Sequence, residues 1–130
     1  MTQELTDNTG EPVTVGRESA DPISAFTVNL PGAPRVGRAE FIDSADADRE
    51  RIFFHTEVDE HYAGRGLAGI LLREALADSI RSGHTVVPVC PLFARHLKKH
   101  GDEFISEGGA WRTPTRADVA LVSRLAHVDS

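Results

Sequence analysis

Residues 52–80 read IFFHTEVDEHYAGRGLAGILLREALADSI, and this stretch decides the fold. Its first part is rich in aromatic and β-branched side chains, which predicts a strand that ends near Val58. From Gly66 onward the apolar residues recur at helical spacing, which predicts a long helix with a wide buried stripe. Three glycines, at positions 64, 66 and 69, mark the junction. The stretch therefore predicts a strand, a glycine-rich turn and a helix in direct succession.

Shorter patterns on both sides of this stretch extend the prediction to an α/β fold. Alternating apolar residues indicate strands, and Pro, Gly or short polar runs mark the turns between them. We expect strands over 23–30, 35–43, 49–58 and 84–90, and helices over 66–81, 92–100 and 116–126. The connections between the first three strands are short, which favours an antiparallel meander. The element order predicts a layer fold: a mixed, mostly antiparallel sheet with a central helix and further helices packed on it.

The length of 130 residues allows one domain and leaves little room for a second. Residues 1–22 are polar, so we expect a flexible tail with at most a short strand at 13–15. Residues 23–112 form the predicted compact domain. Residues 113–130 form a C-terminal helix whose apolar stripe packs on the domain or on a second copy, which leaves a monomer and a weak homodimer both open.

Charge is divided unevenly along the chain, although the formal net charge is -6. Residues 61–100 hold six basic and two acidic side chains, a net charge of +4. This stretch includes the glycine-rich turn, where free N–H groups at a helix start favour a phosphate or pyrophosphate. A Walker site requires Gly-Lys-Ser/Thr, which is missing. A Rossmann site is disfavoured because the preceding strands are expected to be antiparallel.

Several classes of protein are excluded by composition. The single cysteine rules out an internal disulfide and a zinc site with several Cys ligands, including the deaminase pattern, so we expect no metal. An acidic chain argues against nucleic-acid binding. The sequence has no apolar run long enough for a membrane span and no secretory signal, which predicts a cytoplasmic protein with a reduced thiol.

Four short motifs together resemble the GNAT acetyltransferase superfamily. They are FHTEV at 54–58, YAGRGLA at 62–68, VVPVCP at 86–91 and HLKKH at 96–100. More narrowly, the chain is similar to a short GNAT-like acetyl-CoA-binding subfamily with a Cys-Pro pair. The resemblance covers about residues 39–104. It implies acetyl-CoA as co-substrate and a cofactor-binding role for the long helix.

The resemblance also implies individual residue roles. Amides in the loop would hold the pyrophosphate of coenzyme A; the candidate cofactor-binding residues are Val58, Gly64, Arg65, Gly66, Leu67, Ala68, Gly69, Cys90 and Lys99. Ala63 stands where the superfamily usually has Arg or Gln, which removes one side chain that shapes the loop. The backbone N–H near Val58 would polarise the thioester carbonyl. His96 stands where the subfamily often has a Tyr.

Three residues are candidates for catalysis: Glu57, Cys90 and His96. Glu57 and His55 are two apart on one strand and share a face, so Glu57 either accepts a proton from an amine or is an exposed residue paired with an Arg. Cys90 lies near a helix start, which permits a covalent acyl-cysteine, a cofactor contact or a buried apolar role. His96 and His100 lie on one helix face, where two ligands do not make a metal site.

The resemblance, together with these residues, implies acetyl transfer from acetyl-CoA to an amine on a small molecule or protein. Only four residues, 31–34, separate the first two strands, so the helices that cover the acceptor site in ordinary GNAT enzymes are absent. We therefore expect an open acceptor side. The alternatives are an acetyl-CoA or CoA-binding module without fast turnover, and slow self-acylation through Cys90.

Overall fold

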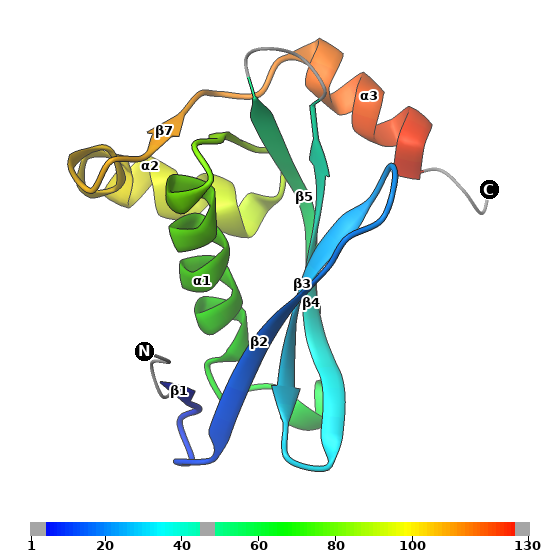
Figure 1. The fold of residues 1–130 in the computed structure, drawn as a ribbon, viewed down its shortest axis with the longest axis vertical. Coiled ribbons are helices and arrows are strands. Elements are labelled where there is room, and N and C mark those ends of the chain that lie inside the picture. The colour runs from blue at the N-terminus through cyan, green and yellow to red at the C-terminus, as the bar shows by residue number, and fades with distance from the viewer. Residues whose placement is uncertain (1–4, 45–48, 127–130) are drawn as a thin grey trace.

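A computed structural model describes residues 5–44 and 49–126 of the chain. In this part a curled sheet carries three α-helices and one short 3₁₀ helix (Figure 1). The strands are β1 Leu5–Thr6, β2 Pro12–Glu18, β3 Ser24–Leu30, β4 Ala33–Asp43, β5 Glu50–Val58, β6 Thr85–Pro88 and β7 Ala110–Trp111. The helices are η1 Glu60–Tyr62, α1 Leu67–Arg81, α2 Pro91–Ser106 and α3 Arg116–Ala126. None of the described helices is long and apolar enough to cross a membrane.

The described strands lie in the sheet in the order in which they occur along the chain. Strands β1 to β5 pair antiparallel with their neighbours, whereas β6 pairs parallel with β5 and β7 parallel with β6. Helix α1 makes the crossover that a parallel pair requires between β5 and β6. The prediction of a mixed, mostly antiparallel sheet with a central helix is confirmed, and so is the meander of β3, β4 and β5.

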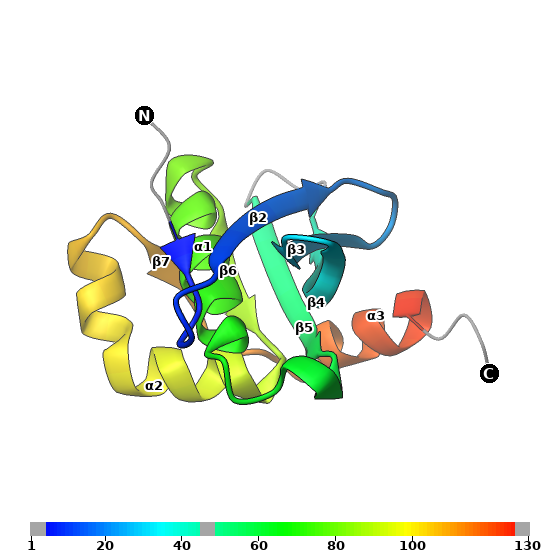
Figure 2. The same cartoon turned by 90° about the horizontal axis from the view of Figure 1, so that it is seen from below.

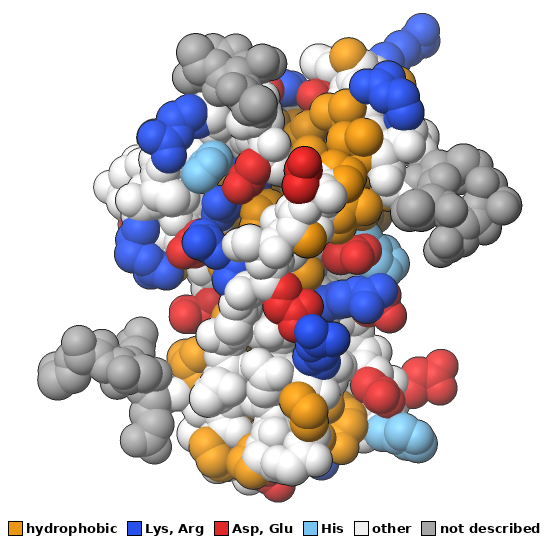
Figure 3. Space-filling view, turned by 45° about the vertical axis from the view of Figure 1, so that its right-hand side comes forward, with side chains coloured by type: hydrophobic (Ala, Val, Ile, Leu, Met, Phe, Trp, Pro, Cys, Tyr) orange, Lys and Arg blue, Asp and Glu red, His pale blue; other side chains and the backbone are white. Residues whose placement is uncertain are grey.

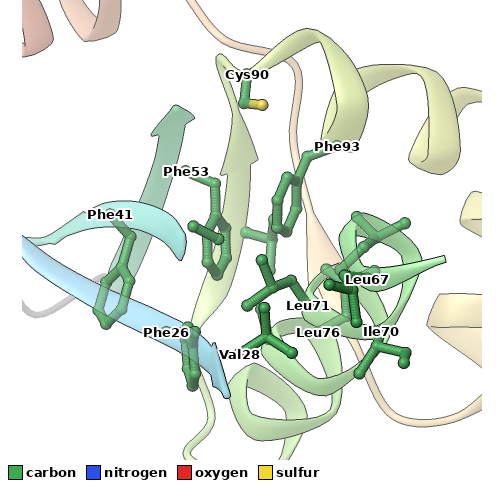
Figure 4. Close-up of a cluster of buried hydrophobic side chains, with 14 of the residues drawn as sticks. Phe26, Val28, Phe41, Phe53, Leu67, Ile70, Leu71, Leu76, Cys90 and Phe93 are labelled. Atoms are coloured by element: carbon green, nitrogen blue, oxygen red, sulfur yellow. The ribbon is translucent and has the colours of Figure 1, made fainter. Parts of the chain in front are cut away.

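The hydrophobic core lies between one face of the sheet and helices α1 and α2 (Figure 2). Its centre is aromatic, because Phe53 of β5 stacks on Phe93 of α2 with 4.3 Å between ring centroids. Phe26 and Phe41 extend the cluster along β3 and β4. Leu71 of α1 is fully buried against these rings (Figure 4). The apolar stripe predicted for α1 therefore faces the sheet.

A buried arginine ties the sheet to α1. The Arg51 side chain is 1% exposed and lies over the Phe41 ring, 4.6 Å from its centroid. It forms ion pairs with Asp43 at 2.7 Å and with Asp78 of α1 at 2.9 Å. Buried charges require such partners, because an unpaired guanidinium would be strongly destabilising.

The N-terminal segment differs from the sequence prediction. Where a flexible tail was expected, residues 5–18 form β1 and β2 at the edge of the sheet, and the short strand expected at 13–15 lies within β2. Strand β2 pairs with β3 from Thr14 to Glu18, and Val13 is 4% exposed in the core. This segment has only two alternating valines, but it still forms a strand because the exposed edge of β3 supplies partners for its backbone hydrogen bonds. Residues 1–4 lie outside the described part.

Helix α2 is longer than the helix expected over 92–100. It kinks at His100, whose φ of -121° is not helical, and continues to Ser106. Gly101 does not end the helix. A Cβ at Gly101 would lie 2.8 Å from Trp111 Nε1, so the glycine instead makes room for the indole of β7. The short strand β7 lies where the sequence predicted an irregular segment.

Helix α3 matches the predicted bounds of 116–126, and residues 127–130 lie outside the described part. Within α3, only Asp118 is buried. Arg112 joins this helix to the sheet, because its guanidinium bonds both Asp118 Oδ2 at 2.7 Å and Glu50 Oε2 at 2.6 Å. Val119 remains 48% exposed. Hydrophobic side chains gather on the molecular surface over α3 (Figure 3).

Candidate functional site

An opening between β5 and β6 is the main feature of the candidate site. These strands pair only over Glu50–Phe53 and Thr85–Pro88. The Phe53 carbonyl accepts the N–H groups of both Val89 (2.9 Å) and Cys90 (2.8 Å), and there the strands part. Strand β5 continues to Val58, and no described strand pairs with it on that side beyond Phe53. The free strand edge can pair with an extended ligand.

Backbone alternation decides which amides of β5 face this opening. The Asp59 N–H donates to Val36 O on β4 at 2.7 Å. Since successive residues of a strand point to opposite edges, the Val58 N–H points away from β4, toward the opening. The backbone N–H of Val58 can therefore donate a hydrogen bond into the opening, where the sequence analysis expected a donor.

Cys90 lies at the far end of β6, next to the opening. It is the residue before α2 and is 4% exposed. Its Sγ lies 3.4 Å from Thr56 Oγ1 across the opening. Figure 4 shows Cys90 beyond the rings of Phe53 and Phe93. The sequence analysis missed Thr56, although its alternation with Glu57 places its side chain on the opposite face of β5.

The glycine-rich loop follows β5 and η1 and leads directly into α1. Gly64 and Gly66 have φ values of +81° and +80°, a conformation that side chains disfavour. Gly66 is the residue before the helix, and no side chain caps this helix start. The first turn of α1 contains no acidic residue. The N–H groups of Leu67, Ala68 and Gly69 therefore remain available to an anion, as the first amides of a helix have no intrahelical partner.

Two arginines near the loop have different surroundings. The Arg65 guanidinium lies 3.3 Å from buried Asp7 and over the Tyr62 ring, 5.0 Å from its centroid, so protein groups already engage it. Arg73, which the sequence analysis did not single out, has no ion pair within residues 5–44 and 49–126. A Cβ at Gly69 would lie 3.3 Å from Arg73 Nη1. The sequence signal that could have identified Arg73 is its position four residues after Gly69, because residues four apart are neighbours on a helix surface.

The opposite face of β5 carries the acid expected to act on an acceptor. Glu57 Oε1 lies 3.0 Å from His55 Nε2 and 3.1 Å from Arg38 Nη2 of β4. The predicted shared face of His55 and Glu57 is confirmed. All three side chains are about half exposed. The alternative that Glu57 is an exposed residue paired with an Arg describes this arrangement, and its role as a proton acceptor stays a prediction.

The remaining candidates lie on α2. His96 is partly buried, and its ring centroid lies 5.0 Å from that of His100. Burial, together with the neighbouring His100, lowers the pKa of His96 below its ordinary value. Lys99 is exposed. No metal-binding cluster occurs among the residues that the structure describes.

The region that contains this geometry also matches a known protein family. The family described as GCN5-related N-acetyl-transferase matches residues 25–106, more than half of the chain. The chain belongs to the GCN5-related N-acetyltransferase family. The match begins at β3, ends with α2 and contains the opening, the glycine-rich loop and Cys90. Members of this family generally use acetyl-CoA. No curated protein matches the chain closely enough to add a second comparison.

Proposed function

We propose that this GCN5-related N-acetyltransferase binds acetyl-CoA in the opening between β5 and β6 and transfers its acetyl group to an amine. The observation that carries the proposal is the parting of β5 and β6 directly upstream of an uncapped helix start. One feature offers a strand edge to an amide-containing chain, and the other offers amides to a pyrophosphate. Coenzyme A contains both groups, because its amide-containing pantetheine arm is joined directly to its pyrophosphate.

The residues that would bind acetyl-CoA form a continuous path. The amides from Gly64 to Gly69 receive the pyrophosphate, and the helix dipole of α1 favours its negative charge. Arg73 adds a cation beside Gly69. The Val58 N–H pairs with the thioester end, while Thr56 and Cys90 line the end of the opening. Lys99 supplies a further cation for a phosphate group. The Cys-Pro subfamily assignment stays a prediction.

Glu57 and Val58 would share the chemistry. The amine attacks the thioester carbonyl carbon, so that a C–N bond forms, the C–S bond breaks and coenzyme A leaves as the thiolate. The Val58 N–H stabilises the negative charge that develops on the carbonyl oxygen. Glu57 accepts the amine proton directly or through water. Both described contacts of Glu57 are made by Oε1, which leaves Oε2 for this proton.

The acceptor side is open, which bears on the substrate and on a second candidate function. Residues Pro31 and Gly32 alone separate β3 from β4, so no helix covers this side between them. Neighbouring Glu57 and Arg38 are about half exposed. An open side admits an amine on a protein or a small molecule. It also favours the alternative of an acetyl-CoA-binding module without fast turnover, because nothing between β3 and β4 encloses an acceptor.

Calorimetric titration with CoA and acetyl-CoA tests binding, and release of free CoA in the presence of a panel of amines tests transfer. We expect Glu57→Gln to reduce amine-dependent CoA release by about 100-fold with CoA affinity unchanged, because general base catalysis contributes roughly that factor. Glu60→Gln, at another exposed acid in η1, is the matched control and should have no effect.

Three outcomes separate the hypotheses. Amine-dependent CoA release that is lost in Glu57→Gln supports N-acetyl transfer. Tight CoA binding with no release for any amine supports the binding module instead. A stable mass increase of one acetyl group, absent in Cys90→Ala, supports self-acylation. A wild-type protein that binds neither CoA nor acetyl-CoA at millimolar concentration contradicts all three.

A further inference from the structure

The turn between β1 and β2, residues Asp7–Gly10, contacts the glycine-rich loop from outside the region that matches the family. The Asn8 N–H donates to Arg65 O at 2.9 Å, and Asn8 Nδ2 donates to Gly64 O at 3.4 Å. The N-terminal segment therefore lies against the loop that enters α1, more than 50 residues later in the chain (Figure 2). The family match begins only at residue 25.

Asp7 is the most enclosed group of this turn, with a side chain that is 0% exposed. Its Oδ1 accepts from Thr9 N at 2.8 Å, Thr9 Oγ1 at 2.7 Å and Glu11 N at 3.0 Å. Its Oδ2 accepts from Arg65 Nη1 at 3.3 Å. The hydrogen bonds from Thr9 lower the pKa of Asp7, so the carboxylate is charged at neutral pH. One buried anion thus orders its own turn and holds an arginine of the loop.

Asn8 covers the glycine that precedes α1. A Cβ at Gly66 would lie 2.9 Å from Asn8 Oδ1, so the carboxamide rests on the glycine itself. A loop of this kind loses much conformational entropy when it becomes ordered, because glycine has more accessible conformations than other residues. Contacts that restrict Gly64, Arg65 and Gly66 before the ligand arrives remove that cost from binding.

We propose that Asp7 and Asn8 are positioning residues that hold the glycine-rich loop in its anion-binding conformation, Asp7 through Arg65. The proposal rests on the proposed function, since the anion is the pyrophosphate of coenzyme A. The proposal predicts a change in CoA affinity that is opposite to the change expected from charge alone. Removing the negative charge of Asp7 strengthens binding of a polyanion if charge alone matters, and weakens binding if Asp7 positions the loop.

The test measures the Kd for CoA by calorimetry in the full chain and in Asp7→Asn. We expect the Asp7→Asn substitution to weaken CoA binding about tenfold, the effect of losing roughly one hydrogen bond to a charged group. Asp118→Asn is a matched control, because Asp118 is also buried and also bonds an arginine, Arg112, and a threonine, Thr115. It should lower the melting temperature similarly and leave the Kd within about twofold.

Two further variants keep the proposal testable if Asp7→Asn does not fold. Asn8→Ala removes only an exposed carboxamide and should also weaken CoA binding. Arg65→Gln should weaken it by a similar factor, and the Asp7→Asn/Arg65→Gln double variant should bind no more weakly than the weaker single variant. Amide hydrogen exchange over 64–69 in the unliganded protein should be faster in Asn8→Ala than in wild type.

The outcomes distinguish this proposal from the proposed function. CoA binding by Asp7→Asn and Asn8→Ala that equals or exceeds wild-type binding overturns the positioning role and leaves the proposed function intact. Additive losses in the double variant show that Arg65 acts on the phosphate independently of Asp7, which also overturns it. Absence of CoA binding by the wild type overturns the proposed function, and with it the ligand that the loop is positioned for.

Discussion

The N-terminal turn and the C-terminal segment use the same local chemistry for different purposes. In the turn, Asp7 bonds Thr9 and Arg65; in the C-terminal segment, Asp118 bonds Thr115 and Arg112. Arg65 belongs to the glycine-rich loop, whereas Arg112 follows β7 and bridges Glu50 of β5 to α3. The first arrangement therefore supports the candidate cofactor site, and the second attaches an outer helix.

The two buried carboxylates differ in the group that each one holds, since Asp7 bonds an arginine of the loop and Asp118 bonds an arginine that joins the sheet to α3. Both carboxylates have lowered pKa values, each from hydrogen bonds that its neighbours donate. Apart from its ion pair with Arg112, α3 has few buried contacts with the rest of the protein, since Asp118 is its only buried residue. Changes in the C-terminal segment should therefore affect stability alone, and changes in the N-terminal turn should affect ligand binding as well.

The largest expected effect on CoA binding is at Gly66, where the N-terminal turn touches the loop. Gly66→Ala should weaken CoA binding by about 30-fold or more, because a Cβ both strains a φ of +80° and displaces Asn8. Gly83→Ala is the control, since Gly83 also has a positive φ but has open space around it. Calorimetry should find unchanged CoA affinity in Gly83→Ala despite a similar loss of stability. Equal affinity in the two variants would contradict the role of the turn.

Arg112→Met in the C-terminal segment should have a much smaller effect on CoA binding, although it should lower stability. The substitution leaves Glu50 and Asp118 without their shared cation, which should lower the free energy of unfolding by about 3 kcal/mol. Urea unfolding measures this loss, and calorimetry should show CoA affinity within about twofold of wild type. Weaker CoA binding in Arg112→Met would break the distinction between the two regions.

The smallest expected effect concerns acid stability. Hydrogen bonds from Arg112 lower the pKa of Asp118 from 3.8 to about 2. The depressed pKa contributes stability that is fully present above the unfolded value and is lost as the pH falls through the folded value. The difference in unfolding free energy between wild type and Asp118→Asn should therefore shrink by about 2 kcal/mol between pH 5 and pH 2. Urea titrations at several pH values measure it, and a difference that stays constant with pH would contradict the assignment.

Local patterns were sufficient for β3, β4, β5, β6 and α1 of the central domain. The helical spacing after Gly66 predicted α1 because a 3.6-residue period is a property of the sequence itself. The alternation of His55 and Glu57 likewise predicted their shared face. The partner of Glu57 was not predictable as a specific residue, because a register shift between Glu40 and Phe41 decides which residue of β4 lies opposite.

Errors occurred where a distant segment changes the meaning of a residue. Glycine commonly ends a helix, so the sequence predicted an end at Gly101. Trp111 instead packs against this glycine, and the helix continues. Residues 5–18 lack a strong pattern of their own, yet the edge of β3 and the glycine-rich loop give them partners. Asp7-Asn8-Thr9 is a recognisable turn pattern. Nothing in it indicates contact with Arg65.

By itself the sequence determined the strand, the glycine-rich loop and the helix start, because backbone freedom at Gly64 and Gly66 and apolar periodicity are local properties. It also determined the family resemblance of these residues. Only the tertiary structure decided that β5 and β6 part beyond Phe53, that Arg65 is engaged by Asp7, and that Asn8 rests on Gly66. These contacts join residues far apart in the chain, and their energies depend on burial that exists only after folding.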